Sequence, residues 1–251
     1  MCAACCSRFA PRLPRCRQCA LARVGLATGD GSAKGQTDGR VNRQHVDGRV
    51  EGRCGACLVA PPAYSHAVAA ADYGFPWDRL IARLKFEQAP ELARPLAELL
   101  AQAAGERIAQ PGWPRPDLVL PVPLAPRRQA ERGYNQAWEL ARRIAPRLGL
   151  KAEPLLLERW RETPHQVGAS RAERLRNLGD AFLVDPAWRG ALAGRRIALV
   201  DDVLTTGVTA QAAAQALLAA GAADVQVWVI ARTPPPEDRD ADSPGGAATI
   251  G

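Results

Sequence analysis

The chain has 251 residues, of which 47% are hydrophobic, and a formal net charge of +7. This length accommodates one sizeable domain with a small appendage, and the composition is that of a soluble globular protein. The apolar stretches are too short to cross a membrane and the N-terminus lacks the apolar core of a signal peptide, so we expect a cytoplasmic protein without membrane insertion. The positive charge suits phosphate or nucleic-acid partners, and it equally suits a simple bias towards arginine.

Seven cysteines lie within the first 57 residues, and six of them form C-x-x-C pairs. The pairs are Cys2 and Cys5, Cys16 and Cys19, and Cys54 and Cys57, which leaves Cys6 over. In a reducing compartment such pairs point to metal, because a C-x-x-C turn presents two thiolates to one ion and zinc takes four. We therefore expect residues 1–60 to form a zinc-ribbon-like unit around a structural Zn²⁺, with the six paired cysteines as candidate ligands. The sequence leaves open which four bind the ion and whether His45 replaces one, and the alternative is a set of buried or redox-active cysteines.

The chain beyond the second cysteine pair divides into a loop, a folded domain and a tail. Residues 25–53 are rich in Gly, Asp, Arg and Gln and predict a mobile loop. Residues 61–232 predict the folded domain, and residues 233–251 predict a disordered tail. The first half of the domain predicts a strand at 67–74, helices at 77–86 and 91–104, a strand at 117–124 and a helix at 135–149.

The second half of the domain continues the alternation of strands and helices. It predicts a strand at 153–160, a helix beginning at Ser170, a strand at 195–203, a helix at 209–221 and a final strand at 224–232. Strands that alternate with helices indicate a parallel sheet covered on both faces. The predicted fold class is therefore α/β.

Two adjacent acids, Asp201 and Asp202, come at the carboxyl end of an apolar strand. Ligands of open α/β sheets bind beyond such ends, and two carboxylates there suit neighbouring hydroxyl groups or Mg²⁺. The next residues, "LTTGVT", lead into a helix, where threonine hydroxyls and backbone N–H groups around Gly207 form an anion-binding nest. Together these features predict a site for a sugar phosphate. The alternative is an ordinary strand-turn-helix junction with threonine caps.

The stretch "IALVDDVLTTGVT" resembles the phosphoribosyl-diphosphate (PRPP) binding motif of type I phosphoribosyltransferases. The cysteine pairs, "LKFEQ", "PVPLAPRRQAERGYNQA" and "TPHQVGASRAERLRNLGDAF" narrow the resemblance to the ComF family of competence-associated, phosphoribosyltransferase-like proteins. The resemblance implies a type I phosphoribosyltransferase-like sheet behind the cysteine unit. The chain departs from the family in one place, because the Gly/Asp/Arg-rich loop stands where members commonly carry a further C-x-x-C. We therefore expect about one zinc per chain.

The resemblance also implies roles for individual residues. The acids Asp201 and Asp202 would hold the ribose hydroxyls, and Thr205, Thr206, Gly207, Val208 and Thr209 would cradle the 5-phosphate. Pro121, Val122, Pro123 and Leu124 are similar to the loop that contacts pyrophosphate. Arg127, Arg128 and Arg132 would neutralise that leaving group, since negative charge gathers on it during displacement at the anomeric carbon. The alternative for these arginines is that they are only solvated. Lys85 either reaches the ligand or extends from a helix to solvent.

Two functions follow from these expectations. The first is a Mg²⁺-dependent transfer of the phosphoribosyl group from PRPP to a nitrogenous acceptor, with Asp201, Asp202 and Arg132 as catalytic residues, in a protein linked to DNA uptake. The second is a non-catalytic zinc-ribbon adaptor that handles single-stranded DNA, directly or with a competence helicase. The side of the site that takes the second substrate, the acceptor, would be lined by His165, Gln166, Arg174 and Asn177. The alternative is that these four residues stabilise a loop-helix junction.

Overall fold

The computed structural model describes residues 2–23, 52–160 and 181–234. Most of the predicted loop at 25–53, most of the predicted tail and the predicted helix at Ser170 lie outside these residues. His45 and the four residues assigned to the second-substrate side lie outside them as well.

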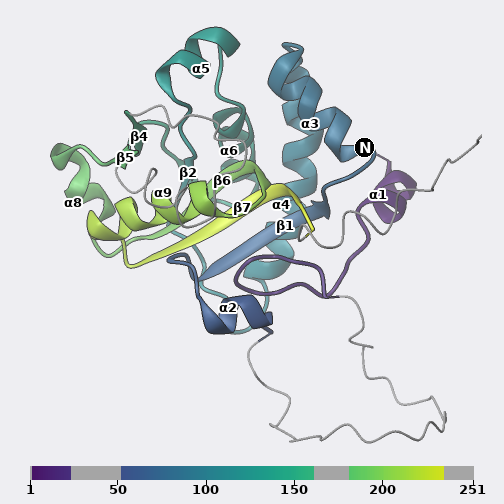
Figure 1. Cartoon of the computed structure of the whole chain (residues 1–251), viewed down its shortest axis with the longest axis horizontal. Coiled ribbons are helices and arrows are strands. Elements are labelled where there is room, and N and C mark those ends of the chain that lie inside the picture. Colours follow the sequence, from purple (N-terminus) through teal and green to yellow (C-terminus); the bar gives the residue numbers. More distant parts are fainter. Residues whose placement is uncertain (1, 24–51, 161–180, 235–251) are drawn as a thin grey trace, which may run out of the picture.

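A five-stranded parallel sheet forms the centre of the molecule, with strand order β1-β7-β6-β2-β3 (Figure 1). Its strands are β1 (His66–Asp72), β2 (Leu118–Pro121), β3 (Lys151–Ala152), β6 (Arg196–Leu204) and β7 (Asp224–Arg232). The strand β7 is buried without interruption from Val225 to Ala231. Such near-continuous apolar runs are typical of parallel strands that are covered on both faces.

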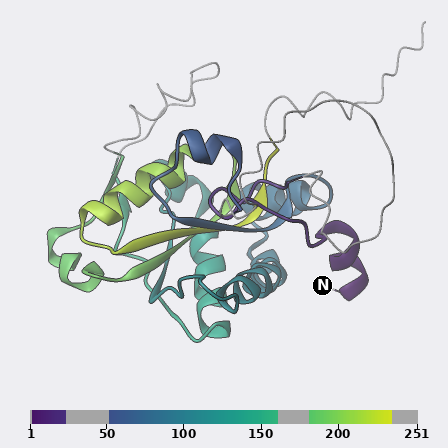
Figure 2. The ribbon, with the colours of Figure 1, turned by 90° about the horizontal axis from the view of Figure 1, so that it is seen from below.

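Helices cover both faces of the sheet, as Figure 2 shows. On one face α9 (Val208–Ala219) packs over Ile197 and Leu199 of β6. On the other face α6 (Gln136–Arg147) packs against β2 and β6, and α4 (Ala93–Ile108) packs against β1 and β7. Buried residues of these two helices and of α3 (Trp77–Phe86) form one core cluster with Ala198 and Val200 of β6. The alternation of side chains along β6 therefore divides the core into two layers. The prediction of an α/β fold with a parallel sheet between helices is confirmed.

Shorter elements complete the described part of the chain. They are α1 (Ala3–Phe9), α2 (Gly55–Val59), the 3₁₀ helix η1 (Pro90–Leu92), α5 (Pro126–Arg132), β4 (Glu158–Arg159), β5 (Phe182–Leu183), the 3₁₀ helix η2 (Pro186–Trp188) and α8 (Arg189–Leu192). The strands β4 and β5 pair with each other in a separate antiparallel sheet. Among the described residues, no helix combines the length and the apolar character that a membrane crossing requires.

The structure corrects two of the predicted elements and adds a helix that was not predicted. The strand predicted at 153–160 is wrong, because only Glu158–Arg159 is extended and it pairs with β5 outside the main sheet. The strand predicted at 117–124 ends at Pro121, after which the chain turns into α5. That helix was not predicted, because its arginine-rich sequence has no apolar face. The helix at 77–86 and the strand at 224–232 have the predicted bounds.

Candidate functional site

The acid pair, Asp201 and Asp202, lies on β6 beside the end of β2. The pairing of β2 with β6 stops at Pro121, which lies opposite Val200, so the acids extend past the neighbouring strand. β6 continues for two residues beyond Asp202. Both acids are therefore inside an extended strand, where successive side chains point to opposite faces. Asp201 follows the row that faces α9, and Asp202 follows the row that faces α3.

Asp202 is almost completely buried, with 3% of its surface exposed. Its Oδ1 forms an ion pair with Nζ of Lys85, from α3, at 2.9 Å. Its Oδ2 is also buried and has no hydrogen-bond partner among the described residues. A buried carboxylate oxygen without a partner is costly, and it fits a hydroxyl donor or a cation. The residues at this edge of the sheet are therefore suited to a ligand with hydroxyl groups or to a divalent cation.

Asp201 has a strongly perturbed carboxyl group. Burial, followed by the neighbouring negative charge of Asp202, raises the pKa of Asp201 to about 7. Its Oδ1 accepts a hydrogen bond from the backbone N–H of Asp202 at 2.8 Å. Neighbouring acids whose like charges repel each other are common at functional sites, and this pair lies at the ligand-binding edge of an α/β sheet. A cation or a pair of hydroxyl donors would relieve this repulsion.

The threonine loop, residues 205–209, connects β6 to α9. Thr205 and Thr206 are exposed, and Gly207 takes the left-handed conformation, with φ of 79°, immediately before the helix. A Cβ atom at Gly207 would lie 3.1 Å from the hydroxyl oxygen of Tyr64, so a side chain there would fit only if Tyr64 moved. Val208 is the first residue of α9 and its side chain is buried in the core, so its backbone N–H has no acceptor within the helix. The first N–H groups of α9 and the helix dipole favour an anion at this loop.

Arg232 is a contact of the threonine loop that the sequence analysis missed. Its guanidinium donates to the carbonyl oxygens of Leu204, at 2.8 Å, and of Thr205. The only signal in the sequence is a charge at the end of the otherwise apolar run "DVQVWVIAR".

The segment predicted to contact pyrophosphate leaves the sheet next to the acid pair. Pro121 and Val122 are buried, whereas Pro123 and Leu124 are half-buried. The amide of Asn135, the N-cap of α6, donates to the carbonyl oxygen of Val122 at 3.1 Å and so fixes the course of the segment.

The three predicted arginines all lie on α5 and differ in their surroundings. Arg127 and Arg128 are exposed, and Arg127 pairs with Glu131 on its own helix. Arg132 is half-buried, and its guanidinium lies 5.3 Å from the ring centre of Phe86. The charges of the acid pair act on Arg132 as well. Arg132 is therefore close enough to the acid pair to interact with it electrostatically.

Four cysteines, Cys16, Cys19, Cys54 and Cys57, form a cluster whose sulfur atoms all lie within 4.8 Å of one another. The sulfurs of Cys19 and Cys54 are 3.6 Å apart. In a tetrahedral zinc site with bonds of about 2.3 Å, the sulfurs lie about 3.8 Å apart, so the cluster fits a metal ion. A hydrogen bond from the Cys19 thiol lowers the pKa of Cys16 to about 4, which gives the cluster one ready thiolate. The sequence left the choice of four ligands open, and the structure brings the second and third pairs together.

The first cysteine pair lies elsewhere. Cys2 and Cys5 are exposed at the start of α1, and neither belongs to the four-cysteine cluster.

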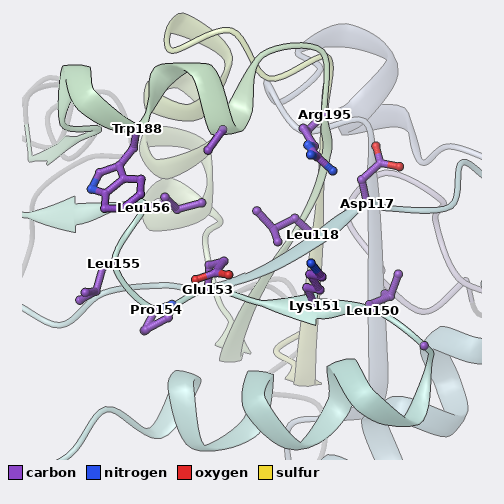
Figure 3. Close-up of a pocket in the computed structure, with 12 residues that line it drawn as sticks. Asp117, Leu118, Leu150, Lys151, Glu153, Pro154, Leu155, Leu156, Trp188 and Arg195 are labelled. Atoms are coloured by element: carbon purple, nitrogen blue, oxygen red, sulfur yellow. The ribbon is translucent and has the colours of Figure 1, made fainter.

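Two cavities of about 520 Å³ each lie beside the segment that follows β3, and Pro154 and Leu155 line both of them. One is lined by Pro121, Pro123 and Leu124 together with residues of the turn between α5 and α6, and it lies on the carboxyl side. The other, shown in Figure 3, is lined by Asp117, Lys151, Trp188 and Arg195, among others. Asp117 and Arg195 immediately precede β2 and β6, so this cavity lies at the amino ends of the strands, away from the acid pair.

Comparisons with known proteins place the chain among named relatives. No protein-family model matches it. DNA utilization protein YhgH of Salmonella typhi is 39% identical over 180 residues, which cover 72% of this chain and 78% of the relative. Competence protein F of Haemophilus influenzae is 35% identical over 179 residues, covering 71% and 78%. Competence protein ComFC of Streptococcus pneumoniae is 32% identical over 111 residues, covering 44% and 46%.

Solved phosphoribosyltransferases overlap with part of the chain. Adenine phosphoribosyltransferase from Leishmania tarentolae is 21% identical with a TM-score of 0.34, covering 55% of this chain and 56% of that one. Glutamine PRPP amidotransferase from B. subtilis is 23% identical with a TM-score of 0.34, covering 54% and 25%.

Proposed function

The chain belongs to the ComF family of competence-associated, phosphoribosyltransferase-like proteins, and from this premise we propose that it binds PRPP with Mg²⁺ and transfers the phosphoribosyl group to a nitrogenous acceptor. The observation that carries the proposal is the buried Oδ2 of Asp202, which has no partner among the described residues and lies at the edge where β6 leads into the threonine loop. The names of the relatives support a link to DNA uptake.

The proposed roles follow the geometry of this edge. The acid pair accepts hydrogen bonds from the ribose hydroxyls, and the N–H groups of the threonine loop hold the 5-phosphate. The segment from Pro121 to Leu124 and the guanidinium of Arg132 face the pyrophosphate. Mg²⁺, when bound with PRPP, neutralises the charge that gathers on the leaving pyrophosphate. Lys85 holds Asp202 in place and keeps one of its oxygens occupied in the ligand-free chain.

The four-cysteine cluster is proposed as a structural zinc site. Four cysteines without another ligand type favour zinc, and a site closed by protein ligands has a structural role. Reduced cysteine pairs persist in reducing compartments, which supports a cytoplasmic location.

Calorimetric titration with Mg-PRPP tests the binding step. The native chain should give saturable binding, and Asp201→Asn combined with Asp202→Asn should weaken it at least about tenfold, because charge-assisted hydrogen bonds are lost. Asp117→Asn is the matched control, since that carboxylate lies before β2 at the opposite edge of the sheet. Absence of binding heat for the native chain, or equal binding by the double variant, would contradict the proposal.

Handling of single-stranded DNA is a second candidate function. The observation that favours it is a pair of exposed rings near α3, each with an arginine over its face. Phe86 is 74% exposed below Arg132, and Phe75 is 64% exposed with Arg79 at 5.5 Å from its ring centre. Exposed aromatic rings among cationic side chains are the usual platform for stacking bases of a single strand.

A gel-shift series with single-stranded DNA at rising salt tests this second function. A salt-sensitive complex that is lost in Phe75→Ala with Phe86→Ala supports direct binding. Leu58→Ala is the control, because Leu58 is a half-exposed apolar residue on α2. Absence of any complex leaves only a role through a partner such as a helicase.

A further inference from the structure

Arg232, the last residue of β7, connects the threonine loop to the four-cysteine cluster. Its Nη1 donates to the carbonyl oxygens of Leu204 and Thr205. Its Nε donates to the carbonyl oxygen of Cys19 at 2.9 Å. One planar guanidinium therefore spans the end of β6 and a residue of the cluster. Its five donors in a fixed fork suit such a bridge better than a lysine does.

The contact with the loop carbonyls sets the direction of the loop amides. A peptide unit is planar and trans, so its C=O and N–H point in opposite directions. Holding the carbonyl of Leu204 therefore directs the N–H of Thr205 away from Arg232, and holding the carbonyl of Thr205 does the same for Thr206. These N–H groups begin the anion-binding loop.

A second connection runs from the same cluster to the same loop. Gln18 lies between the two cysteines of the second pair and is 4% exposed. Its amide donates to the carbonyl oxygens of Pro62, at 3.3 Å, and Tyr64, at 3.2 Å. The Tyr64 hydroxyl in turn lies against Gly207. Two independent sets of contacts, through Arg232 and through Gln18 with Tyr64, thus join the four-cysteine cluster to the threonine loop.

The position of Cys19 depends on what its sulfur binds. Cys19 is buried, and its sulfur lies in the cluster that fits a metal ion. An ion fixes all four sulfurs, and it thereby fixes the backbone of Cys19, including the carbonyl that Arg232 contacts. Without the ion, thiols at these distances separate or repel one another when ionised, because structural thiolate sites are ordered by their metal.

We propose that Arg232 is a positioning residue that couples metal occupancy of the four-cysteine cluster to the geometry of the threonine loop. The metal-loaded cluster holds the Cys19 carbonyl, Arg232 bridges to the loop carbonyls, and the loop amides keep the orientation that binds a phosphate. The proposal rests on the proposed function for the identity of the phosphate, but the coupling itself is a property of the chain.

Amide hydrogen exchange in the full chain tests the coupling without any ligand. Arg232→Gln, with its zinc retained, should raise exchange about tenfold in residues 211–213, because charge-assisted contacts to the loop are lost. The N–H of Gln211 donates to the carbonyl oxygen of Gly207, so its protection reports on the geometry of the loop. Residues 225–230 in the centre of β7 should keep their protection. The control is Arg196→Gln, which removes an arginine from the opposite end of the adjacent strand, where it pairs with Asp117.

Chelation of zinc from the native chain is a second test of the coupling, and this step does not depend on a variant folding correctly. Removing the metal from the native chain should raise exchange in the same residues 211–213. Chelation of Arg232→Gln should add little to this region, because the connection is already broken. Unchanged exchange in the variant, or full additivity of chelation and substitution, would overturn the proposal.

Titration with ribose 5-phosphate and with pyrophosphate separates positioning of the loop from a general loss of structure. Arg232→Gln should weaken ribose 5-phosphate about tenfold and leave pyrophosphate unchanged. An equal loss for both ligands would contradict a specific role in the loop. If ribose 5-phosphate does not bind to the native chain, the proposed function fails, while the exchange measurements still decide the coupling.

Discussion

Replacing Gly207 with alanine tests whether the threonine loop has the tight geometry described above. Gly207 has φ of 79°, a conformation that costs a residue with a side chain about 1–2 kcal/mol. The new Cβ would also lie 3.1 Å from the hydroxyl oxygen of Tyr64. Tyr64 is 3% exposed, so its ring cannot move away freely, and overpacking of this kind costs about 1–3 kcal/mol. The total loss in the free energy of unfolding should be about 2–5 kcal/mol.

Gly133→Ala separates the two contributions. Gly133 has φ of 77°, but a Cβ there meets nothing within 4 Å. This variant should therefore lose only the conformational part, about 1–2 kcal/mol. The difference between the two variants measures the contact with Tyr64.

Urea unfolding followed by circular dichroism gives these free energies, and a double-mutant cycle with Tyr64→Phe assigns them. Removing the hydroxyl should recover about 1 kcal/mol in the Gly207→Ala background. If Gly207→Ala costs no more than Gly133→Ala, or if the cycle shows no coupling, the described packing of the loop against Tyr64 is wrong.

Three further predictions concern the acids, Lys85 and the cysteines. Because the pKa of Asp201 is raised to about 7 from 3.8, the folded chain holds a proton that the unfolded chain releases. The stability contribution of this group is therefore present at low pH and is lost as pH rises towards 7, and Mg-PRPP affinity should rise over the same range as the carboxylate forms. Thermal melts and titrations across pH should show both trends, and Asp201→Asn should flatten them. Lys85→Met should cost about 3 kcal/mol in urea unfolding, since it leaves the buried Asp202 unpaired, and Lys85→Met with Asp202→Asn should recover most of it; equal stability of the three chains would refute the buried pair. Metal analysis should find about one zinc per chain in Cys2→Ser with Cys5→Ser but none in Cys16→Ser with Cys19→Ser, and the reverse pattern would contradict the cluster.

Local sequence patterns were sufficient where burial alone decides the structure. The strand at 224–232 and the helix at 77–86 were predicted at their bounds, because one is an apolar run and the other has helical periodicity. The run from Leu155 to Leu157 resembles a buried strand, but Leu155 is 66% exposed at a cavity wall and only Leu156 and Leu157 are buried. The apolar character of a segment alone does not show whether it forms a buried strand or the exposed wall of a cavity.

The contacts of the site could not be predicted, because they depend on long-range folding. The pattern "LVDDVLTTG" indicated an acid pair before an anion-binding turn, and the structure places both at one edge of the sheet. The ion pair from Lys85 to Asp202 joins residues from two distant elements. The grouping of the second and third cysteine pairs likewise needs a chain closure that no local spacing specifies. Arg232 was missed for the same reason.

A structure of the chain determined with PRPP and Mg²⁺ is the most direct test of the proposed site. The 5-phosphate should accept hydrogen bonds from backbone N–H groups of the threonine loop, while the ribose hydroxyls contact the acid pair. PRPP bound at the amino-end cavity beside Trp188, or over the exposed arginines of α5 with the acid pair untouched, would contradict it.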